Sequence, residues 1–334
     1  MARKSPRVTI TDVARTAGVS LSTVSRVMND NPTVDPALAE RVRAIAAELG
    51  YTANPLARSL VLGRTQTVAV VIPDLANPTF QAILRGLSRA ADEDGYHVLI
   101  ADTAEQVDKE PGLATTTRRR TDGVILCAPR MAQDELTALL PALAPAVVIN
   151  RPPQPEAPTV AADYRSAMAD LVAHLYGLGH RRIAFLSGVA GSASGAARQA
   201  AQAEARAAHP DLEIIEIPTG VDFDSGAEAA GAVLAAGVTA VLAFNDLVAM
   251  GLLSAVTARG MRVPEDVSIA GFDDIPFARY TSPPLTTAAV PAAELGRRAW
   301  AAMSALLTGD AASPSLVLTP EVVVRGSTAA APTS

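Results

Sequence analysis

Aromatic residues and cysteine are scarce in this sequence. Phe, Trp and Tyr make up 4% of the 334 residues, although 49% are hydrophobic. We therefore expect a helix-rich α/β protein whose core is packed with small aliphatic side chains. Cys127 is the single cysteine, so no internal disulfide can form, and its apolar neighbours predict a buried strand thiol instead of a nucleophile.

Long apolar stretches are missing as well. No run reaches the length of a membrane span, and the N-terminus leads into charged helix signals instead of the apolar core of a secretion signal. We expect a cytoplasmic protein that has no membrane partner.

Catalytic and metal-binding patterns are also absent. The glycine-rich segment 188–195 lacks the Lys-Ser/Thr ending of a phosphate loop, and Ala193 stands where a nucleophile elbow requires serine. The histidines lie without metal-ligand spacing, at His97, His174, His180 and His209. The sequence predicts no catalytic residue, no metal and no cofactor.

The charge is unevenly distributed along the chain. Residues 1–64 carry nine Lys and Arg against five Asp and Glu, whereas the remainder carries 19 against 29. A basic segment joined to an acidic body is typical of a protein that contacts phosphates at one end. The length suits a small domain followed by a bilobed one.

Three short helices are predicted in the basic segment. Thr9 can cap a helix through residue 17, Ser20 a second through about residue 29, and Asp35 a third through residue 49. Apolar residues recur on one face of each helix, and those of the third are Leu38, Val42, Ile45 and Leu49. A tight turn at Gly18 joins the first two helices, which is typical of a helix-turn-helix.

The second helix leaves a polar face outside this core. It contains a single cation, no acidic residue and several small hydroxyls that can approach DNA closely. The alternative is an ordinary solvated helix face. In the DNA interpretation Arg26 reads guanine and the N-terminal residues touch base edges, while the others contact phosphates. The candidate DNA-binding residues of the headpiece are Thr9, Thr11, Leu21, Ser22, Thr23, Ser25, Arg26 and Asn29.

The segment VTITDVARTAGVSLSTVSRVMN, residues 8–29, resembles the headpiece of the LacI/GalR family of bacterial regulators. The resemblance continues through residues 49–51 and the segment NPLARSL at 54–60, and covers essentially the whole chain. It implies a hinge that folds into a helix on DNA, with Leu60 wedged into the minor groove. Alternatively, Leu60 is a linker residue that packs on the core. The hinge candidates for DNA contact are Asn54, Ala57, Arg58 and Leu60.

Short apolar runs alternate with helical segments after residue 67, which predicts doubly wound parallel sheets. The runs are 68–72, 97–101, 124–127, 146–150, 183–187, 213–217, 240–244 and 267–271. With the resemblance, the expected fold is an all-α three-helix helix-turn-helix headpiece and an α/β two-lobed periplasmic-binding-protein-like core. The expected limits are 1–53 for the headpiece, 54–64 for the hinge and 65–330 for the core, with an N-lobe of 65–162 and 291–319 and a C-lobe of 163–290 and 320–330.

A ligand of such a core would lie where the strands end. The candidate effector-binding residues, most of them just after a strand, are Asp74, Asn77, Phe80, Asn150, Arg151, Arg198, Phe244, Asn245 and Asp273. The resemblance assigns effector contact to Arg198, Asn245 and Asp273. A carboxylate, a guanidinium and an amide near an aromatic ring suit vicinal hydroxyls, so a sugar or sugar derivative is expected, with a purine as the alternative.

Several neighbouring residues have structural interpretations beside the functional ones. Asp246 can be a first-turn acid, Asp274 a turn cap and Asp163 a structural hydrogen-bonding group, and Phe80 can belong to the core. The family often has an aromatic residue where Val221 stands, and the sequence does not decide whether Phe223 replaces it.

The expected function is that of a homodimeric repressor at the nucleoid, binding a pseudo-palindromic operator and controlled by a small effector. The C-terminus has no leucine heptads, which predicts a dimer without a tetramerising coiled coil. One alternative is a solute-binding protein for transport. Another is a regulator whose effector is a protein co-regulator.

Overall fold

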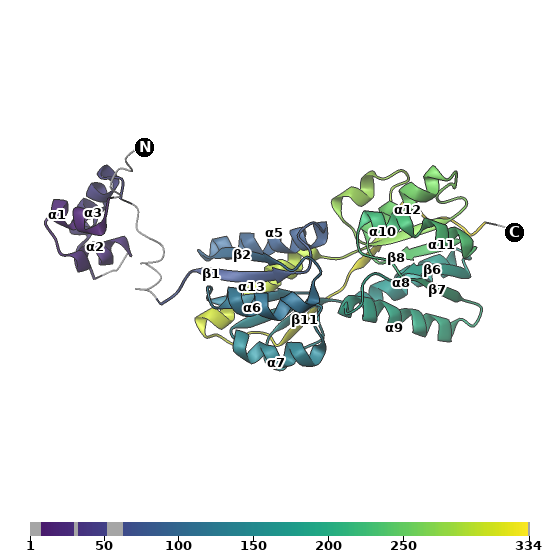
Figure 1. The fold of residues 1–334 in the computed structure, drawn as a ribbon, viewed down its shortest axis with the longest axis horizontal. Coiled ribbons are helices and arrows are strands. Elements are labelled where there is room, and N and C mark those ends of the chain that lie inside the picture. Colours follow the sequence, from purple (N-terminus) through teal and green to yellow (C-terminus); the bar gives the residue numbers. More distant parts are fainter. Residues whose placement is uncertain (1–7, 30–32, 52–62, 333–334) are drawn as a thin grey trace. The chain divides into compact units, whose positions relative to one another are not determined.

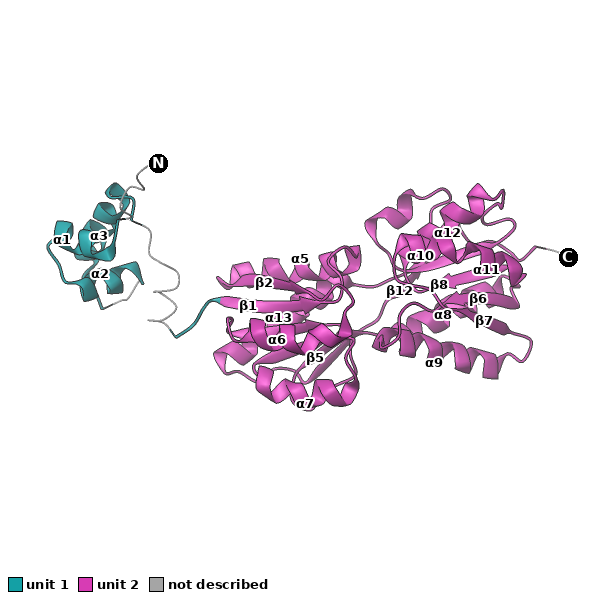
Figure 2. Cartoon of the chain, in the orientation of Figure 1, with its two compact units in different colours: residues 1–66 teal, residues 67–334 magenta. Residues whose placement is uncertain are grey.

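The computed structural model describes residues 8–29, 33–51 and 63–332, and these form two compact units, 1–66 and 67–334 (Figures 1 and 2). Among these residues no helix is both long enough and apolar enough to cross a membrane.

The first unit consists of three helices: α1 (Ile10–Ala17), α2 (Leu21–Met28) and α3 (Pro36–Glu48). A hydrogen bond between a side chain and the backbone stabilises the first turn of each helix. The Thr9 backbone N–H donates to the Asp12 carboxylate (3.0 Å), Ser20 Oγ accepts from the Thr23 N–H (3.1 Å) and Asp35 Oδ1 accepts from the Leu38 N–H (3.0 Å). α1 ends at Gly18, whose φ of 65° is left-handed.

The core of this unit is small and aliphatic. Val13, Val24 and Val42 are fully buried at its centre. On α3 the alanines at 39 and 46 are buried beside Val42, whereas Leu38, Ile45 and Leu49 are only partly buried at the edge of the cluster. The predicted face of α3 is therefore rotated toward the smaller side chains, because three short helices pack closely enough for alanine to fill the centre.

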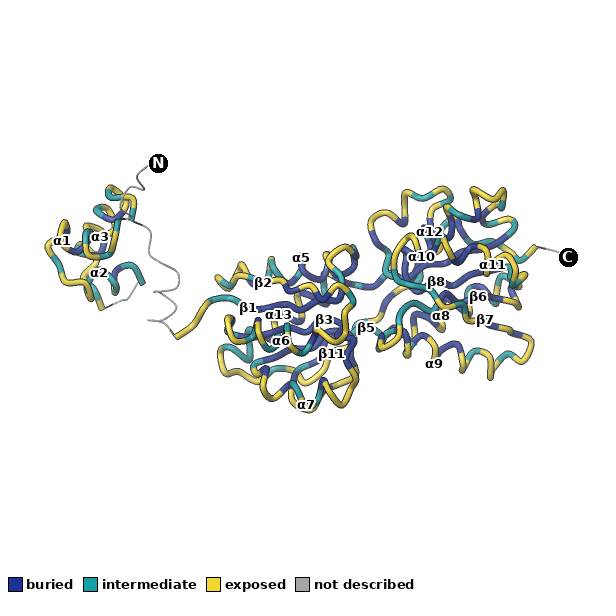
Figure 3. Tube along the Cα trace, in the orientation of Figure 1, coloured by how far each residue is buried: buried dark blue, intermediate teal, exposed yellow. Residues whose placement is uncertain are grey.

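The second unit contains two six-stranded sheets, one in each lobe. The N-lobe sheet has the order β11-β5-β4-β3-β1-β2, and all its strands are parallel. Its strands are β1 (Thr67–Ile72), β2 (His97–Asp102), β3 (Gly123–Cys127), β4 (Ala146–Ile149), β5 (Thr159–Ala162) and β11 (Ser315–Leu318). Every residue of β3 and β4 is buried, as expected for central strands covered on both faces (Figure 3).

The C-lobe sheet has the order β12-β10-β9-β8-β6-β7. Its strands are β6 (Arg182–Leu186), β7 (Glu213–Ile217), β8 (Ala240–Ala243), β9 (Ser268–Asp273), β10 (Thr286–Ala289) and β12 (Glu321–Val323). The edge strand β12 pairs antiparallel with β10, so this sheet is mixed. The apolar runs of the sequence did not predict β5, β10, β11 and β12, because these strands are short and β11 and β12 bury few residues.

Helices cover both sheets (Figure 1). Those of the N-lobe are α5 (Pro78–Glu93), α6 (Glu110–Arg118), α7 (Gln133–Leu143) and α13 (Ala292–Thr308), with the short η1 (Val107–Lys109). Those of the C-lobe are α8 (Tyr164–Gly177), α9 (Ala193–Ala208), α10 (Phe223–Glu228), α11 (Ala230–Ala235) and α12 (Asp246–Ala258), with the short η2 (Pro276–Tyr280). The chain changes lobe after β5, β10 and β11. These three crossovers leave the carboxyl ends of the parallel strands facing a cleft between the lobes.

Candidate functional site

The outer face of α2 is polar and exposed. Val24 and Val27 face the core, while Leu21 is 50% exposed and Ser22 and Arg26 are exposed beside it. This helix has no acidic residue, and its small hydroxyl side chains and one guanidinium are groups that contact phosphates and base edges. This face therefore has the properties of a contact surface.

The hydroxyls on this face are arranged by the helix cap. Ser20 Oγ lies 2.8 Å from both Ser22 Oγ and Thr23 Oγ1, and the Asn29 amide donates to the Ser25 carbonyl (2.9 Å). Thr9 and Thr11 are exposed at the start of α1. The four hinge candidates for DNA contact, Asn54, Ala57, Arg58 and Leu60, lie outside the described residues, so their role stays a prediction.

A small pocket lies in the cleft between the lobes, and we call it the inner pocket. Its free volume is about 30 Å³. Seven of the nine predicted effector residues line it: Asn77, Phe80, Asn150, Arg198, Phe244, Asn245 and Asp273. They come from both lobes, and the residues beside them that were not predicted are Thr79, Glu105, Ala128, Arg130, Tyr164, Ser194 and Val221.

Arg198 is the central cation of the inner pocket. It is 1% exposed, and its guanidinium carbon lies 4.0 Å from the ring centre of Phe272, 4.6 Å from that of Phe244 and 4.7 Å from that of Tyr164. Nη1 donates to Ser194 Oγ (3.0 Å), while the buried Nε has no partner among the described residues. Burial lowers the pKa of this guanidinium.

Asp273 is the carboxylate of the inner pocket and ends β9 with a positive φ of 108°. Its Oδ2 accepts a hydrogen bond from Thr79 Oγ1 (2.9 Å), which belongs to α5 of the other lobe. Burial raises the pKa of Asp273 to about 6, although the charge of Arg198 and the Thr79 hydrogen bond both act to lower it. The carboxylate is therefore held in an unfavourable environment, which is common at binding sites.

Three asparagines of the inner pocket are held by local hydrogen bonds. Asn245 caps α12 through the Val248 N–H (2.9 Å) and donates to the Val221 carbonyl (2.8 Å). Asn150 accepts from the Ala162 N–H (3.0 Å) and donates to the Tyr164 hydroxyl (2.8 Å). Asn77 caps α5 through the Thr79 N–H (2.9 Å).

Two predicted effector residues do not line the inner pocket. Asp74 accepts from the Ala76 N–H (2.7 Å) within its own loop. Arg151 is buried and donates to the carbonyls of Pro129 (2.8 Å) and Met131 (2.9 Å), so it supports the loop after β3. Asn150 has a left-handed φ of 56°, so the backbone turns at the end of β4 and Asn150 and Arg151 contact different parts of the lobe.

The structure shows which contacts are made by the residues for which the sequence allows a structural role. Asp246 is fully buried and accepts from Thr287 Oγ1 (2.6 Å) and the Ile275 N–H (2.8 Å), and burial raises its pKa well above the usual value. Asp274 forms an ion pair with Arg325 (2.6 Å), and Asp163 caps α8. Phe80 is both a core residue and a pocket wall. Val221 lines the pocket, whereas Phe223 is 44% exposed elsewhere.

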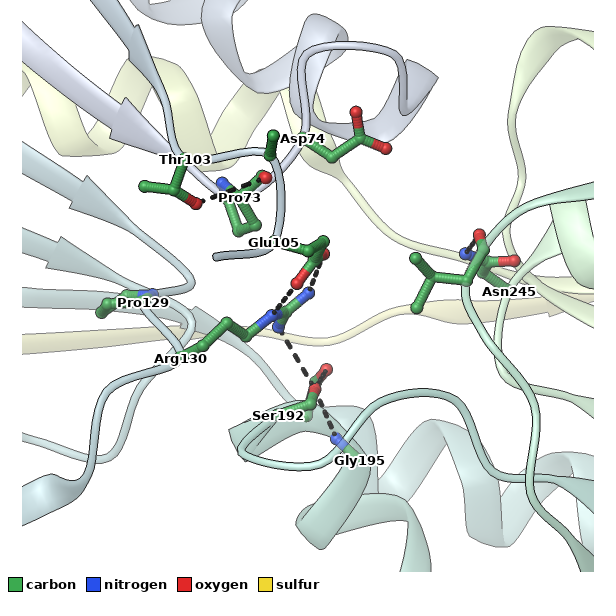
Figure 4. Close-up of polar contacts among 12 residues, drawn as sticks. Pro73, Asp74, Thr103, Glu105, Pro129, Arg130, Ser192, Gly195 and Asn245 are labelled. Atoms are coloured by element: carbon green, nitrogen blue, oxygen red, sulfur yellow. Dashed lines mark hydrogen bonds and ion pairs between the residues drawn. The ribbon is translucent and has the colours of Figure 1, made fainter. Parts of the chain in front are cut away.

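Arg130 is the most prominent residue that sequence reasoning missed. It follows β3 by three residues and lies between Glu105 and Ser192 (Figure 4). Its guanidinium forms an ion pair with Glu105 (2.9 Å) and donates to Ser192 Oγ of the opposite lobe (3.4 Å). The signal that would have found Arg130 and Glu105 is the one used for Asn150, namely a polar residue just after a predicted strand.

Comparison with known proteins gives consistent matches over nearly the whole chain. Residues 9–54 match the bacterial regulatory proteins of the lacI family, and residues 172–328 match a periplasmic binding protein-like domain. The transcriptional regulator DegA of Bacillus subtilis is 34% identical over 96% of this chain and 98% of its own length. The transcriptional repressor CytR of Escherichia coli is 34% identical over 97% of each chain.

Solved structures agree with these relatives. The Lac repressor dimer bound to operator and the anti-inducer ONPF superimposes with a TM-score of 0.88 at 29% identity, over 97% of this chain and 100% of that one. The regulator CelR in complex with cellobiose gives a TM-score of 0.70 at 31% identity, over 96% and 100%. The helix-turn-helix unit, the two-lobed core and the close relatives over nearly full length together show that the chain belongs to the LacI family of bacterial regulatory proteins and is a DNA-binding transcriptional regulator.

Proposed function

We propose that the protein is a repressor that binds a pseudo-palindromic operator as a homodimer and that a sugar bound between its lobes changes its affinity for the operator. The observation that carries this proposal is the presence, in one chain, of an exposed reading face on α2 and a buried pocket around Arg198 and Asp273. Related regulators support it, because CytR is a repressor and CelR was solved with cellobiose.

DNA reading is assigned to the exposed face of α2. Arg26 is its cation, and a guanidinium can donate two hydrogen bonds to the major-groove edge of guanine. Ser22 and Thr23 are small enough to let the helix approach the bases closely. We propose that the hinge at 54–64 and the core at 65–330 follow this headpiece as the sequence predicts.

Sugar binding is assigned to the inner pocket. A carboxylate that accepts, a guanidinium that donates and an amide that does both can satisfy neighbouring hydroxyl groups, while the rings around Arg198 can contact the apolar face of a sugar. The pocket joins residues of both lobes, and Thr79 already bonds Asp273 across the cleft. A ligand that binds one arrangement of the lobes better than another shifts their equilibrium.

Dimerisation is supported by apolar side chains on the surface of the core. Tyr280 is 79% and Phe277 54% exposed in the C-lobe, and Leu99 and Ile100 on the edge strand β2 are about 40% exposed in the N-lobe. Exposed apolar groups and an open sheet edge are typical of association surfaces. Two copies also match the symmetry of a palindromic operator.

Selection of bound fragments from random and genomic DNA by the purified protein tests the proposal. We expect a two-fold symmetric site whose affinity changes when one member of a sugar panel is added. Asp273→Ala is expected to abolish the effector response and to leave operator binding without sugar unchanged. A symmetric site that no sugar affects would point to a protein co-regulator, and the absence of any symmetric site at low salt would contradict the proposal.

A further inference from the structure

A second cavity adjoins the inner pocket, and we call it the outer cavity. It has a volume of about 710 Å³ and lies between the loops after β3 and β4 of the N-lobe and the segment 187–199 of the C-lobe. The inner pocket, at about 30 Å³, has room for about one water molecule. Ligand pockets usually measure roughly 300–1,000 Å³, so of these two adjoining spaces the outer cavity has the size of a ligand site and the inner pocket does not.

Arg130 separates the two spaces, since it lines both. Its backbone is held firmly, because the buried Glu110 carboxylate accepts from the N–H groups of Arg130 (2.9 Å) and Met131 (2.8 Å). The contact of its side chain with Ser192 is much weaker, because 3.4 Å is long for a hydrogen bond. The side chain can therefore leave Ser192 while its backbone stays in place.

A series of hydrogen bonds connects the two spaces. Ser192 Oγ lies 2.9 Å from Ser194 Oγ, which accepts from Arg198 Nη1 (3.0 Å). Movement of Arg130 away from Ser192 thus exposes the hydroxyls of Ser192 and Ser194, and Ser194 is hydrogen-bonded to the guanidinium of Arg198. One ligand can occupy both spaces once this contact is broken.

The walls of the outer cavity favour an uncharged, hydroxylated ligand. The cations that border it are engaged with the protein, Arg130 with Glu105 and Arg151 with two backbone carbonyls. Glu216 is exposed in the wall of the cavity, and its negative charge disfavours an anionic ligand. The side-chain amide of Gln199 donates a hydrogen bond to the Glu216 carboxylate (2.9 Å). Apolar side chains lie beside these polar groups, which suits a sugar ring with its hydroxylated edge and apolar faces.

We propose that the outer cavity is a second subsite of the effector site and that the effector is an uncharged molecule of two parts, a disaccharide or a glycoside. Its first part binds near Arg198 and Asp273 after Arg130 leaves Ser192, and its second part fills the outer cavity. This proposal rests on the proposed function, because it specifies the effector class of the same cleft.

Calorimetric titration of the full-length protein with sugars of two lengths tests it. The panel consists of glucose, galactose, xylose and ribose, and of cellobiose, maltose, lactose and xylobiose. We expect at least one disaccharide to bind at least tenfold more tightly than either of its component sugars. Equal affinity for a disaccharide and its component sugar, or binding of monosaccharides alone, would overturn the second subsite.

Two tryptophan substitutions on α9 provide a matched pair. Ala196 and Ala203 are both exposed, but Ala196 lines the outer cavity and Ala203 does not. Ala196→Trp is expected to weaken disaccharide binding at least tenfold and to leave monosaccharide binding and operator binding without sugar unchanged. Ala203→Trp is expected to leave all three unchanged, and thermal melts of both variants confirm that they fold.

The outcomes distinguish the two proposals. If Ala196→Trp weakens disaccharide binding no more than Ala203→Trp does, the outer cavity is not a subsite, while the sugar-responsive repressor stands. If no sugar of either length binds to a protein that still recognises its operator, the sugar effector of the proposed function is itself wrong.

Discussion

At the scale of single residues, the inner pocket contains buried charged groups whose hydrogen-bonding and solvation needs the protein does not fully satisfy. Arg198 is buried with an unpartnered Nε, and the Asp273 pKa is raised by burial. Such groups reduce the stability of the folded protein unless a ligand satisfies them. The same groups give the pocket its binding capacity, which accounts for their presence.

The substitution Asp273→Asn tests how much the buried Asp273 carboxylate lowers the free energy of unfolding, because that effect depends on pH. Because the folded-state pKa of about 6 lies above the ordinary value of 3.8, folding favours the protonated form. The stabilisation is therefore fully present below pH 3.8 and is lost as the pH rises to about 6. We expect the variant to exceed the wild type in free energy of unfolding by up to about 3 kcal/mol at pH 7.5, and by about 1 kcal/mol at pH 4.5.

Urea unfolding at the two pH values measures this difference. Asp108→Asn removes an exposed carboxylate of the N-lobe and serves as the control, with little change expected at either pH. A difference between Asp273→Asn and wild type that is the same at both pH values would show that the raised pKa does not affect stability.

Arg26→Ala tests the reading face of α2. Because one guanidinium can contact two acceptors of a guanine, its loss is expected to cost about 1–3 kcal/mol of operator binding and to relax the preference for one base pair in each half-site. Binding to operators substituted at each position measures both effects. Arg15→Ala, an exposed arginine of α1, is the control. A uniform loss of affinity across all operators would instead indicate a phosphate contact.

At the scale of elements, α13 packs against α5 through glycine. A Cβ built on Gly296 of α13 would lie 2.0 Å from the Ile83 carbonyl oxygen of α5, which is far inside van der Waals contact. The two helices approach this closely because no side chain separates them. Since α13 reaches the N-lobe only after a crossover, this contact holds a distant part of the chain to the lobe.

Gly296→Ala is therefore expected to lower the free energy of unfolding by about 1–3 kcal/mol, because the helices must move apart. Gly231→Ala in α11 is the matched control, since no atom beyond its chain neighbours and the nearby backbone of its own helix lies within 4 Å of the added Cβ. There the better helix propensity of alanine is expected to raise stability by up to about 1 kcal/mol. Thermal and urea unfolding distinguish the two, and equal effects would contradict the close approach of α5 and α13.

At the scale of the whole molecule, the assembly is expected to contain two chains. The exposed apolar groups of the core offer an association surface for a second copy. Sedimentation equilibrium at micromolar concentration is expected to give the mass of two chains with and without operator DNA. Tyr280→Glu, which places a charge on the most exposed aromatic residue of the core, is expected to shift the mass toward one chain. A mass of four chains would contradict the prediction.

How far the sequence predicts the fold differs between the two units. The helices of the headpiece were predictable because caps and i, i+3, i+4 spacing are local properties, and Ser20 and Asp35 cap the helices as expected. The central strands of the core were predictable because they are continuously apolar. The edge strands β11 and β12 were not, because strands that bury few residues have no such pattern.

The sequence by itself determined the helix-turn-helix, the α/β core, the family and the strand-end residues Asn150, Asn245 and Asp273, since each depends on a local pattern or on a polar residue after an apolar run. Only the tertiary structure decided which of these polar residues meet in one pocket. In the tertiary structure Arg151 donates hydrogen bonds that support the loop after β3, and Arg130 reaches across the cleft to Ser192. The physical reason is that contact between lobes depends on the relative position of loops far apart in the chain, which no local pattern records.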